Sequence, residues 1–172
     1  MDIKEVIQKR YSCRSYKDTP VPEEKLKNIL EAARLAPSAR NRQPYKFIIV
    51  KNKEKREKIA TAAAGQSFIA KAPIIIAGVS LDPEGIMTCE VPAYAVDVAI
   101  AMEHIALQAS AEGLGTCWIG AFSQEEAKKV LEIPEEYKIV ALMPFGYPAD
   151  SPGPKDRKNL DELVSYEKYG GY

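Results

Sequence analysis

The chain has 172 residues, and its 24 lysines and arginines balance its 24 aspartates and glutamates, so the formal net charge is zero. This length predicts one domain with its own hydrophobic core, and neutrality argues against the basic surfaces with which proteins bind nucleic acids or membranes. Cys13, Cys89 and Cys117 form no C-x-x-C pair, and the charged N-terminus lacks the apolar run of a signal peptide. We therefore expect a cytoplasmic protein with neither a disulfide framework nor a metal site.

Hydrophobic periodicity, caps and breakers predict helices and strands that alternate along the chain. The expected helices cover residues 2–10, 23–36, 53–64, 92–112 and 124–132. The expected strands cover residues 45–50, 72–79, 116–119 and 137–146. This alternation is compatible with α/β and with α+β folds. No linker divides the chain, so we expect a single domain over residues 1–172 with a Pro/Gly/Lys-rich C-terminal extension from about residue 147.

The helix expected over residues 92–112 dominates the sequence. Pro92 suits its first turn and Gly113 the position just past its end. Its large apolar side chains point in nearly all directions: Tyr94, Val96, Val98, Ile100, Met102, Ile105 and Leu107. A helix that is apolar all round is buried. In so small a chain a second subunit would most easily supply one wall, so we expect a homodimer.

Several common chemistries are unsupported by the residues. His104 is the only histidine and lies midway along the apolar helix, where a hydrogen-bonded core or interface histidine is expected rather than a catalytic base or zinc ligand. Gly113 and Gly115 form a G-x-G, but Trp118 stands where the dinucleotide fingerprint requires a third glycine. Neither a P-loop nor a nucleophile elbow occurs.

Three separate loops carry basic and polar residues that could together bind an anion. Arginine and lysine beside a hydroxyl suit a phosphate group. Composition alone does not show that these loops meet. The residues are Arg10, Ser12 and Arg14; Ser38, Arg40, Asn41 and Arg42; and Lys155, Arg157 and Lys158. Of these, Arg42 and Lys158 are expected to be solvated charges only.

Four motifs in order give the chain a resemblance to a known family. They are R-Y-S-x-R at 10–14, A-P-S-A-x-N-x-Q-P at 36–44, G-L-G-T-C-W-I-G-A-F at 113–122 and P-K-D-R at 154–157. In this order and spacing, over nearly the whole chain, they resemble the FMN-dependent nitroreductase family. The resemblance implies a homodimer of α+β subunits, each a three-layer α/β/α arrangement. A mixed antiparallel sheet would be flanked by helices, with a long buried central helix and a C-terminal tail exchanged between subunits.

The resemblance also implies the cofactor and its contacts. FMN would lie at the subunit interface and pass hydride from NAD(P)H, through flavin N5, to a nitroaromatic, quinone or similar acceptor that takes its turn in the same pocket. Arg14 would lie by flavin N1 and O2, where its charge favours the reduced form. The phosphate, ribityl and ring contacts would come from Arg10, Tyr11, Ser12, Gln66, Gly120, Ala121, Lys155 and Arg157, with Pro37, Ser38, Ala39 and Asn41 contributed by the partner. No catalytic side chain is expected, because the cofactor carries the chemistry.

Other functions stay open at this point. The connector at residues 81–91 is short where longer relatives insert helices over the acceptor site, so the flavin face should be more open. A deiodinase-like flavin reductase is a minor alternative, because no polar cluster suited to gripping an amino acid is evident. A dimeric flavin carrier without turnover, or an acid-binding protein without flavin, would use the same loops.

Overall fold

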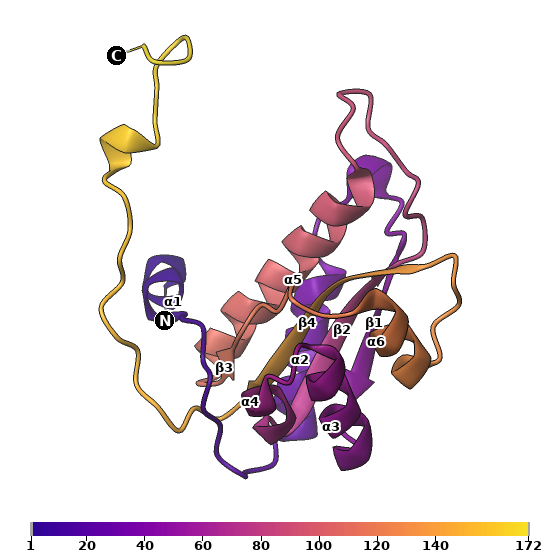
Figure 1. The fold of residues 1–172 in the computed structure, drawn as a ribbon. Coiled ribbons are helices and arrows are strands. Elements are labelled where there is room, and N and C mark those ends of the chain that lie inside the picture. The colour runs from indigo at the N-terminus through magenta and orange to yellow at the C-terminus, as the bar shows by residue number, and fades with distance from the viewer. Residues whose placement is uncertain (1, 172) are drawn as a thin grey trace.

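A computed structural model describes residues 2–171 and shows helices packed around one four-stranded sheet (Figure 1). The α-helices are α1 (Ile3–Lys9), α2 (Glu23–Arg34), α3 (Lys53–Ala62), α4 (Ser67–Lys71), α5 (Ala93–Ala111) and α6 (Gln124–Leu131). The strands are β1 (Tyr45–Val50), β2 (Ile74–Ser80), β3 (Gly115–Thr116) and β4 (Lys138–Gly146). Two short 3₁₀ turns are η1 (Ala39–Asn41) and η2 (Leu160–Glu162).

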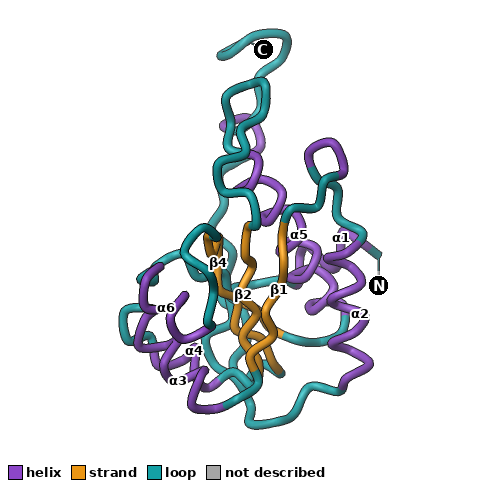
Figure 2. The backbone as a smooth tube through the Cα atoms, turned by 90° about the vertical axis from the view of Figure 1, so that its right-hand side faces the viewer, coloured by secondary structure: helices purple, strands orange, loops and turns teal. Residues whose placement is uncertain are grey.

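The sheet separates two layers of helices. Its strand order is β1-β2-β4-β3, and all three pairings are antiparallel. Helices α2 and α5 share one apolar core with one face of the sheet, and α3, α4 and α6 share another with the opposite face. Figure 2 shows the strands between these two groups. The expected three-layer α+β architecture is therefore confirmed.

Helix ends follow the sequence signals. Asp2 Oδ1 accepts a hydrogen bond from the Glu5 N–H at 2.9 Å, and Ser123 Oγ accepts from Glu126 N–H at 3.3 Å. Each side chain caps a helix N-terminus, α1 and α6 respectively. Gly113, just past α5, has a φ of +78°, a conformation that favours glycine.

The strand expected over residues 116–119 is shorter and begins one residue earlier. The segment does run beside β4, since Cys117 N–H donates to the Pro144 carbonyl and Ile119 bridges to Leu142. Regular pairing nevertheless stops at Thr116. Pro144 has no N–H to complete the ladder on this side, which accounts for the interruption.

The sequence prediction missed α4, a single turn over Ser67–Lys71 where only a break and the start of a strand were expected. The helix has no side-chain N-cap and only five residues. Its Ile69 is fully buried in the core shared with α3 and α6. Tertiary packing, which local propensity does not report, therefore stabilises this turn.

Helix α5 is not buried on all sides within one chain, in keeping with the expectation that a single small chain would not cover it. Val98, Met102 and Ile105 are fully buried against α2 and the sheet, whereas Val96, Ala99, Ile100 and Leu107 are only half-buried. A single sheet and one covering helix therefore leave an apolar stripe of α5 in contact with solvent.

The C-terminal extension runs beside residues 11–16 as far as Asp150 and then extends away from the body of the molecule, as Figures 1 and 2 show. It is exposed over residues 149–170 and contains the single turn η2. Leu160, Leu163 and Tyr166 are each at least 64% exposed there. Apolar side chains on an exposed extension favour contact with another surface.

Candidate functional site

The segment after α1 is fixed to the edge of the sheet. Ser12 bridges to Thr116 of β3 in parallel, and Cys13 N–H donates to the Thr116 carbonyl at 2.9 Å. A Cβ at Gly115 would lie 2.6 Å from the Cβ of the buried Cys13, so only glycine permits this close approach. The pairing places the basic residues of the 10–14 motif beside the segment that follows β3.

Three cations converge at the C-terminal end of α1. Lys155 Nζ donates to the carbonyls of Ile7 and Gln8, the former at 3.1 Å. Burial, and then the neighbouring charges of Arg10 and Arg157, lower the pKa of Lys155. Within residues 2–171 none of the three cations forms an ion pair with a carboxylate. Unneutralised cations held together in this way can bind an anion such as phosphate.

Arg14 lies beside this cluster, near Cys117. Burial raises the pKa of the Cys117 thiol, and the charges of Arg14 and Arg10 together with the Ser12 hydroxyl act in the opposite direction. Arg14 is exposed, and its guanidinium reaches the Ser12 carbonyl at 3.5 Å. The side chain is therefore available to a ligand at the surface.

Gln66 meets the loop after β3. Its Nε2 donates to the Ala63 carbonyl at 2.9 Å and to the Ala121 carbonyl at 3.4 Å. Gly120 and Ala121 are exposed, and the nearest atom to a Cβ built at Gly120 would be 3.9 Å away. The structure thus joins Gln66 to this loop and leaves the loop backbone open to a ligand.

The loop at residues 37–44 lies at the other end of α5. Its Ala39 N–H donates to Asp97 Oδ1 at 2.9 Å, near the start of that helix. The 10–14 segment follows α1, whose Val6 carbonyl is 3.5 Å from the hydroxyl of Ser110, near the end of α5. Asp97 and Ser110 are thirteen residues apart, about 20 Å along the helix axis. One chain therefore keeps these two groups of predicted site residues apart.

The 37–44 loop is built by its own hydrogen bonds. Ser38 Oγ accepts from the Gln43 N–H at 3.0 Å, and Gln43 Nε2 donates to the carbonyl and side chain of Asn41 at 3.1 Å. Arg40, Asn41 and Gln43 have φ values of 54°, 54° and 51°, in the left-handed region. Three such residues in one loop store strain, a feature that clusters at functional sites.

Sequence reasoning missed two residues that position this surface. Asp97, a carboxylate within an otherwise largely apolar helix, is 3% exposed and accepts a hydrogen bond from the Ala39 N–H. Asp150 accepts from the Tyr11 hydroxyl at 2.9 Å and so ties the start of the extension to the 10–14 segment. The position of a carboxylate in a largely apolar helix could have indicated a structural role for Asp97. No local sequence pattern indicates a role for Asp150.

His104 has a hydrogen-bond partner on a neighbouring helix. His104 Nδ1 lies 3.1 Å from the Ala32 carbonyl, as expected for a histidine with a structural hydrogen bond. Among residues 2–171 no group of three or more histidine, cysteine or acidic residues is arranged to hold a metal ion. None of the described helices is both long and apolar enough to cross a membrane.

Comparison with known proteins identifies the family. The sequence pattern of the nitroreductase family matches residues 7–82 and 90–147. The chain is 35% identical over 173 residues to a putative NADH dehydrogenase/NAD(P)H nitroreductase of Methanothermobacter thermautotrophicus, covering 95% of this chain and 86% of the relative. It is 33% identical over 175 residues to the FMN reductase [NAD(P)H] of Bacillus subtilis, covering 92% and 70%.

A solved structure gives the same result. The crystal structure of a nitroreductase family protein from Clostridium novyi NT superposes with a TM-score of 0.83 at 39% identity, covering 99% of this chain and 96% of that one. The protein therefore belongs to the nitroreductase family, and the resemblance seen in its motifs is confirmed. Residues 83–89, between the two matched ranges, fall in the connector between β2 and α5, and residues 1–6 and 148–172 also lie outside the match.

The cation cluster predicts that inorganic phosphate stabilises the flavin-free protein. Phosphate that binds only the folded state should raise the unfolding temperature relative to chloride at equal ionic strength, by about 2–4 °C per kcal/mol of binding free energy for a chain of this size. Arg157→Gln should remove most of this increment, because it deletes one of the three cations. Differential scanning calorimetry measures it.

Lys58→Gln, at an exposed position on α3, is the matched control and should keep the full phosphate effect. Equal stabilisation of all three proteins would mean that phosphate acts only through general exclusion from the surface and that the cluster is not an anion site.

Proposed function

We propose that the protein is an NAD(P)H-dependent FMN oxidoreductase that reduces a nitroaromatic, quinone or similar acceptor. The observation that carries this proposal is the convergence of Arg10, Lys155 and Arg157 on the exposed edge formed by residues 10–14 and the β3 loop, where none of the three forms an ion pair with a carboxylate of residues 2–171. A family relative is an FMN reductase that uses NAD(P)H, which supports the same cofactor and hydride donor here.

The residues present fit FMN. The three cations suit its phosphate, with Ser12 as an exposed hydroxyl beside them and Tyr11 tied to Asp150. The open backbone at Gly120 and Ala121, with Gln66 against it, suits a flat ring edge. When bound, FMN supplies hydride transfer between NAD(P)H and the acceptor. The chain then needs to bind and orient the reactants rather than to provide a nucleophile.

Arg14 and the cation cluster have different tasks in this proposal. The cluster contacts a phosphate whose charge is the same in both redox states, so it contributes affinity only. Arg14, exposed near Cys117, would lie at the pyrimidine edge of the ring, where negative charge appears on reduction. Its guanidinium would therefore favour the reduced state.

A homodimer brings the two groups of site residues together. Within one chain Ala39 is held at the start of α5 and the 10–14 segment near its end. A second copy that packs along the half-buried stripe of α5 could place its own Pro37–Asn41 against the flavin held by the first. The exposed apolar side chains of the extension, such as Leu160 and Leu163, would then contact the partner. We propose such an arrangement, with FMN at the interface.

Absorption and turnover test the function directly. The purified protein, reconstituted with FMN and desalted, should retain flavin absorbance and oxidise NADH or NADPH in the presence of a nitroaromatic or a quinone. Flavin retention without NAD(P)H oxidation by any acceptor would identify a flavin carrier instead. A colourless protein after reconstitution would contradict the proposal.

Arg14→Ala is predicted to lower the two-electron reduction potential of the bound flavin while changing FMN affinity little. A charge-assisted hydrogen bond worth about 1.5–3 kcal/mol to the reduced form alone corresponds to roughly 30–65 mV for two electrons. Arg10→Ala should do the reverse and weaken FMN binding at a nearly unchanged potential. Redox titration and flavin-release measurements on both variants separate the two roles, and an unchanged potential in Arg14→Ala would reassign that arginine to binding.

Ala99→Glu is predicted to abolish the dimer. Ala99 lies on the half-buried stripe of α5, and a carboxylate buried there without a partner destabilises the interface by several kcal/mol. Ala106→Glu, on the same helix, would not test the interface, because Ala106 is 4% exposed and belongs to the core of the single chain. Light scattering after gel filtration measures the mass. Lys58→Glu on α3 is the control, and a dimeric Ala99→Glu protein would place the interface elsewhere.

A further inference from the structure

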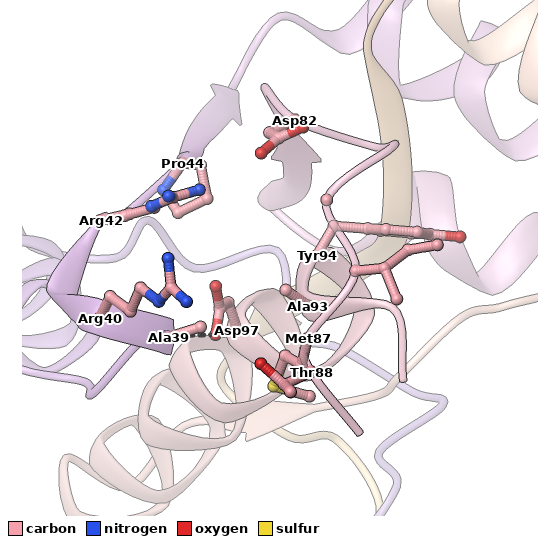
Figure 3. Close-up of a pocket in the computed structure, with 12 residues that line it drawn as sticks. Ala39, Arg40, Arg42, Pro44, Asp82, Met87, Thr88, Ala93, Tyr94 and Asp97 are labelled. Atoms are coloured by element: carbon pink, nitrogen blue, oxygen red, sulfur yellow. Dashed lines mark hydrogen bonds between the residues drawn. The ribbon is translucent and has the colours of Figure 1, made fainter. Parts of the chain in front are cut away.

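A cavity of about 440 Å³ lies between the 37–44 loop, the start of α5 and the connector that follows β2. Figure 3 shows Arg40 and Arg42 on one side of it and Met87, Thr88 and Tyr94 on the other. Ala39, one of the residues proposed to meet the flavin, also lines it. The cavity thus adjoins the part of the loop that would approach the ring.

The lining contains two exposed arginines, Arg40 and Arg42. Neither guanidinium forms an ion pair with any carboxylate of residues 2–171. Arg40 has a left-handed backbone, and the bond from Ala39 N–H to Asp97 holds the residue just before it. Figure 3 shows the Arg40 side chain directed into the cavity. The loop therefore presents charge to the cavity although its backbone is strained.

A second feature of the lining limits where an anionic group can lie in the cavity. Asp97 is 3% exposed and lines the cavity, and its Oδ2 has no hydrogen-bond partner among the residues that the structure describes. Leaving a buried carboxylate oxygen unpaired is costly. Its Oδ1 holds the loop, so replacing Asp97 with an apolar residue would free the arginine-bearing segment. Because Oδ2 is an acceptor that repels an anion, the anionic group of a ligand would lie at the arginines and away from Asp97.

We propose that this cavity binds the anionic group of the electron acceptor and that Arg40 and Arg42 make the enzyme prefer carboxylate-bearing acceptors. The inference rests on the proposed function and names the substrate class of that same site. Planar guanidinium groups pair with carboxylates through two hydrogen bonds each. Both arginines are exposed and stand at the mouth, whereas Asp97 lies at the buried base.

Asp82 and Asp97 give the lining two negative charges against its two positive ones. Asp97 Oδ1 accepts a hydrogen bond from the Ala39 N–H, and Asp82 lies on the connector rather than on the arginine-bearing loop. A carboxylate that enters from solvent meets the exposed arginines before it reaches either aspartate. Removing Asp82 should therefore strengthen the preference for anions, and removing the arginines should abolish it.

The test compares 4-nitrobenzoate with its neutral analogue 4-nitrobenzamide on the FMN-loaded enzyme. Each turnover oxidises one NAD(P)H and, with one proton, converts the nitro group to a nitroso group and water. Arg40→Gln combined with Arg42→Gln should lower the ratio of kcat/KM for benzoate over benzamide by about tenfold, equivalent to about 1.4 kcal/mol. The value for the benzamide should change less than twofold.

Three controls make the outcome decisive. Lys58→Gln should leave the ratio unchanged, and Asp82→Asn should raise it. Calorimetric binding of benzoate to the oxidised FMN-loaded protein needs no turnover, and it should be lost in the double arginine variant. An unchanged ratio, or equal losses for both acceptors, would overturn the inference. Absence of turnover with every acceptor, while benzoate still binds through the arginines, would contradict the proposed function and leave the anion site standing.

Discussion

The apolar surface of α5 is the constraint on which the rest of the molecule depends. The helix carries large apolar side chains on every side, but α2 and the sheet cover only one side of it, where Val98 and Met102 are fully buried. The stripe around Ala99 and Ile100 stays half-buried. Burial of apolar area is the dominant favourable force in folding and association. A fold built around this helix therefore favours a second copy as its remaining wall.

The same helix sets the distance between the parts of the site. Its end lies beside α1, from which the arginines of the 10–14 segment lead to β3, and its start holds the 37–44 loop through Asp97. A rigid rod of 19 residues cannot bring its own ends together. A site assembled from both ends thus requires two copies side by side. In the proposed homodimer, the predicted contacts that are exposed in one chain would face the partner.

Much of the fold was predictable because its signals are local. Asp2 and Ser123 cap helix N-termini through their side chains, and Gly113, expected just past the long apolar helix, has a left-handed backbone there. The prediction failed where residues distant in sequence determine the local structure. Packing of Ile69 in the core stabilises α4, and Pro144 on the adjacent strand shortens β3. The family and its three-layer fold are confirmed, while the individual cofactor contacts stay predictions.

By itself, the sequence determined the family, the order of elements and the basic residues of the cation cluster, because motifs and caps are read within a few residues of each other. Only the tertiary structure decided that Arg10, Lys155 and Arg157 converge, since the extension must return to α1 for them to meet. It also decided that Asp97 is an anchor and that Arg40 faces a cavity. The contact between Ala39 and Asp97 joins residues that are 58 positions apart in the sequence. The helix and strand periodicities of a sequence describe only neighbouring residues and do not report such a contact.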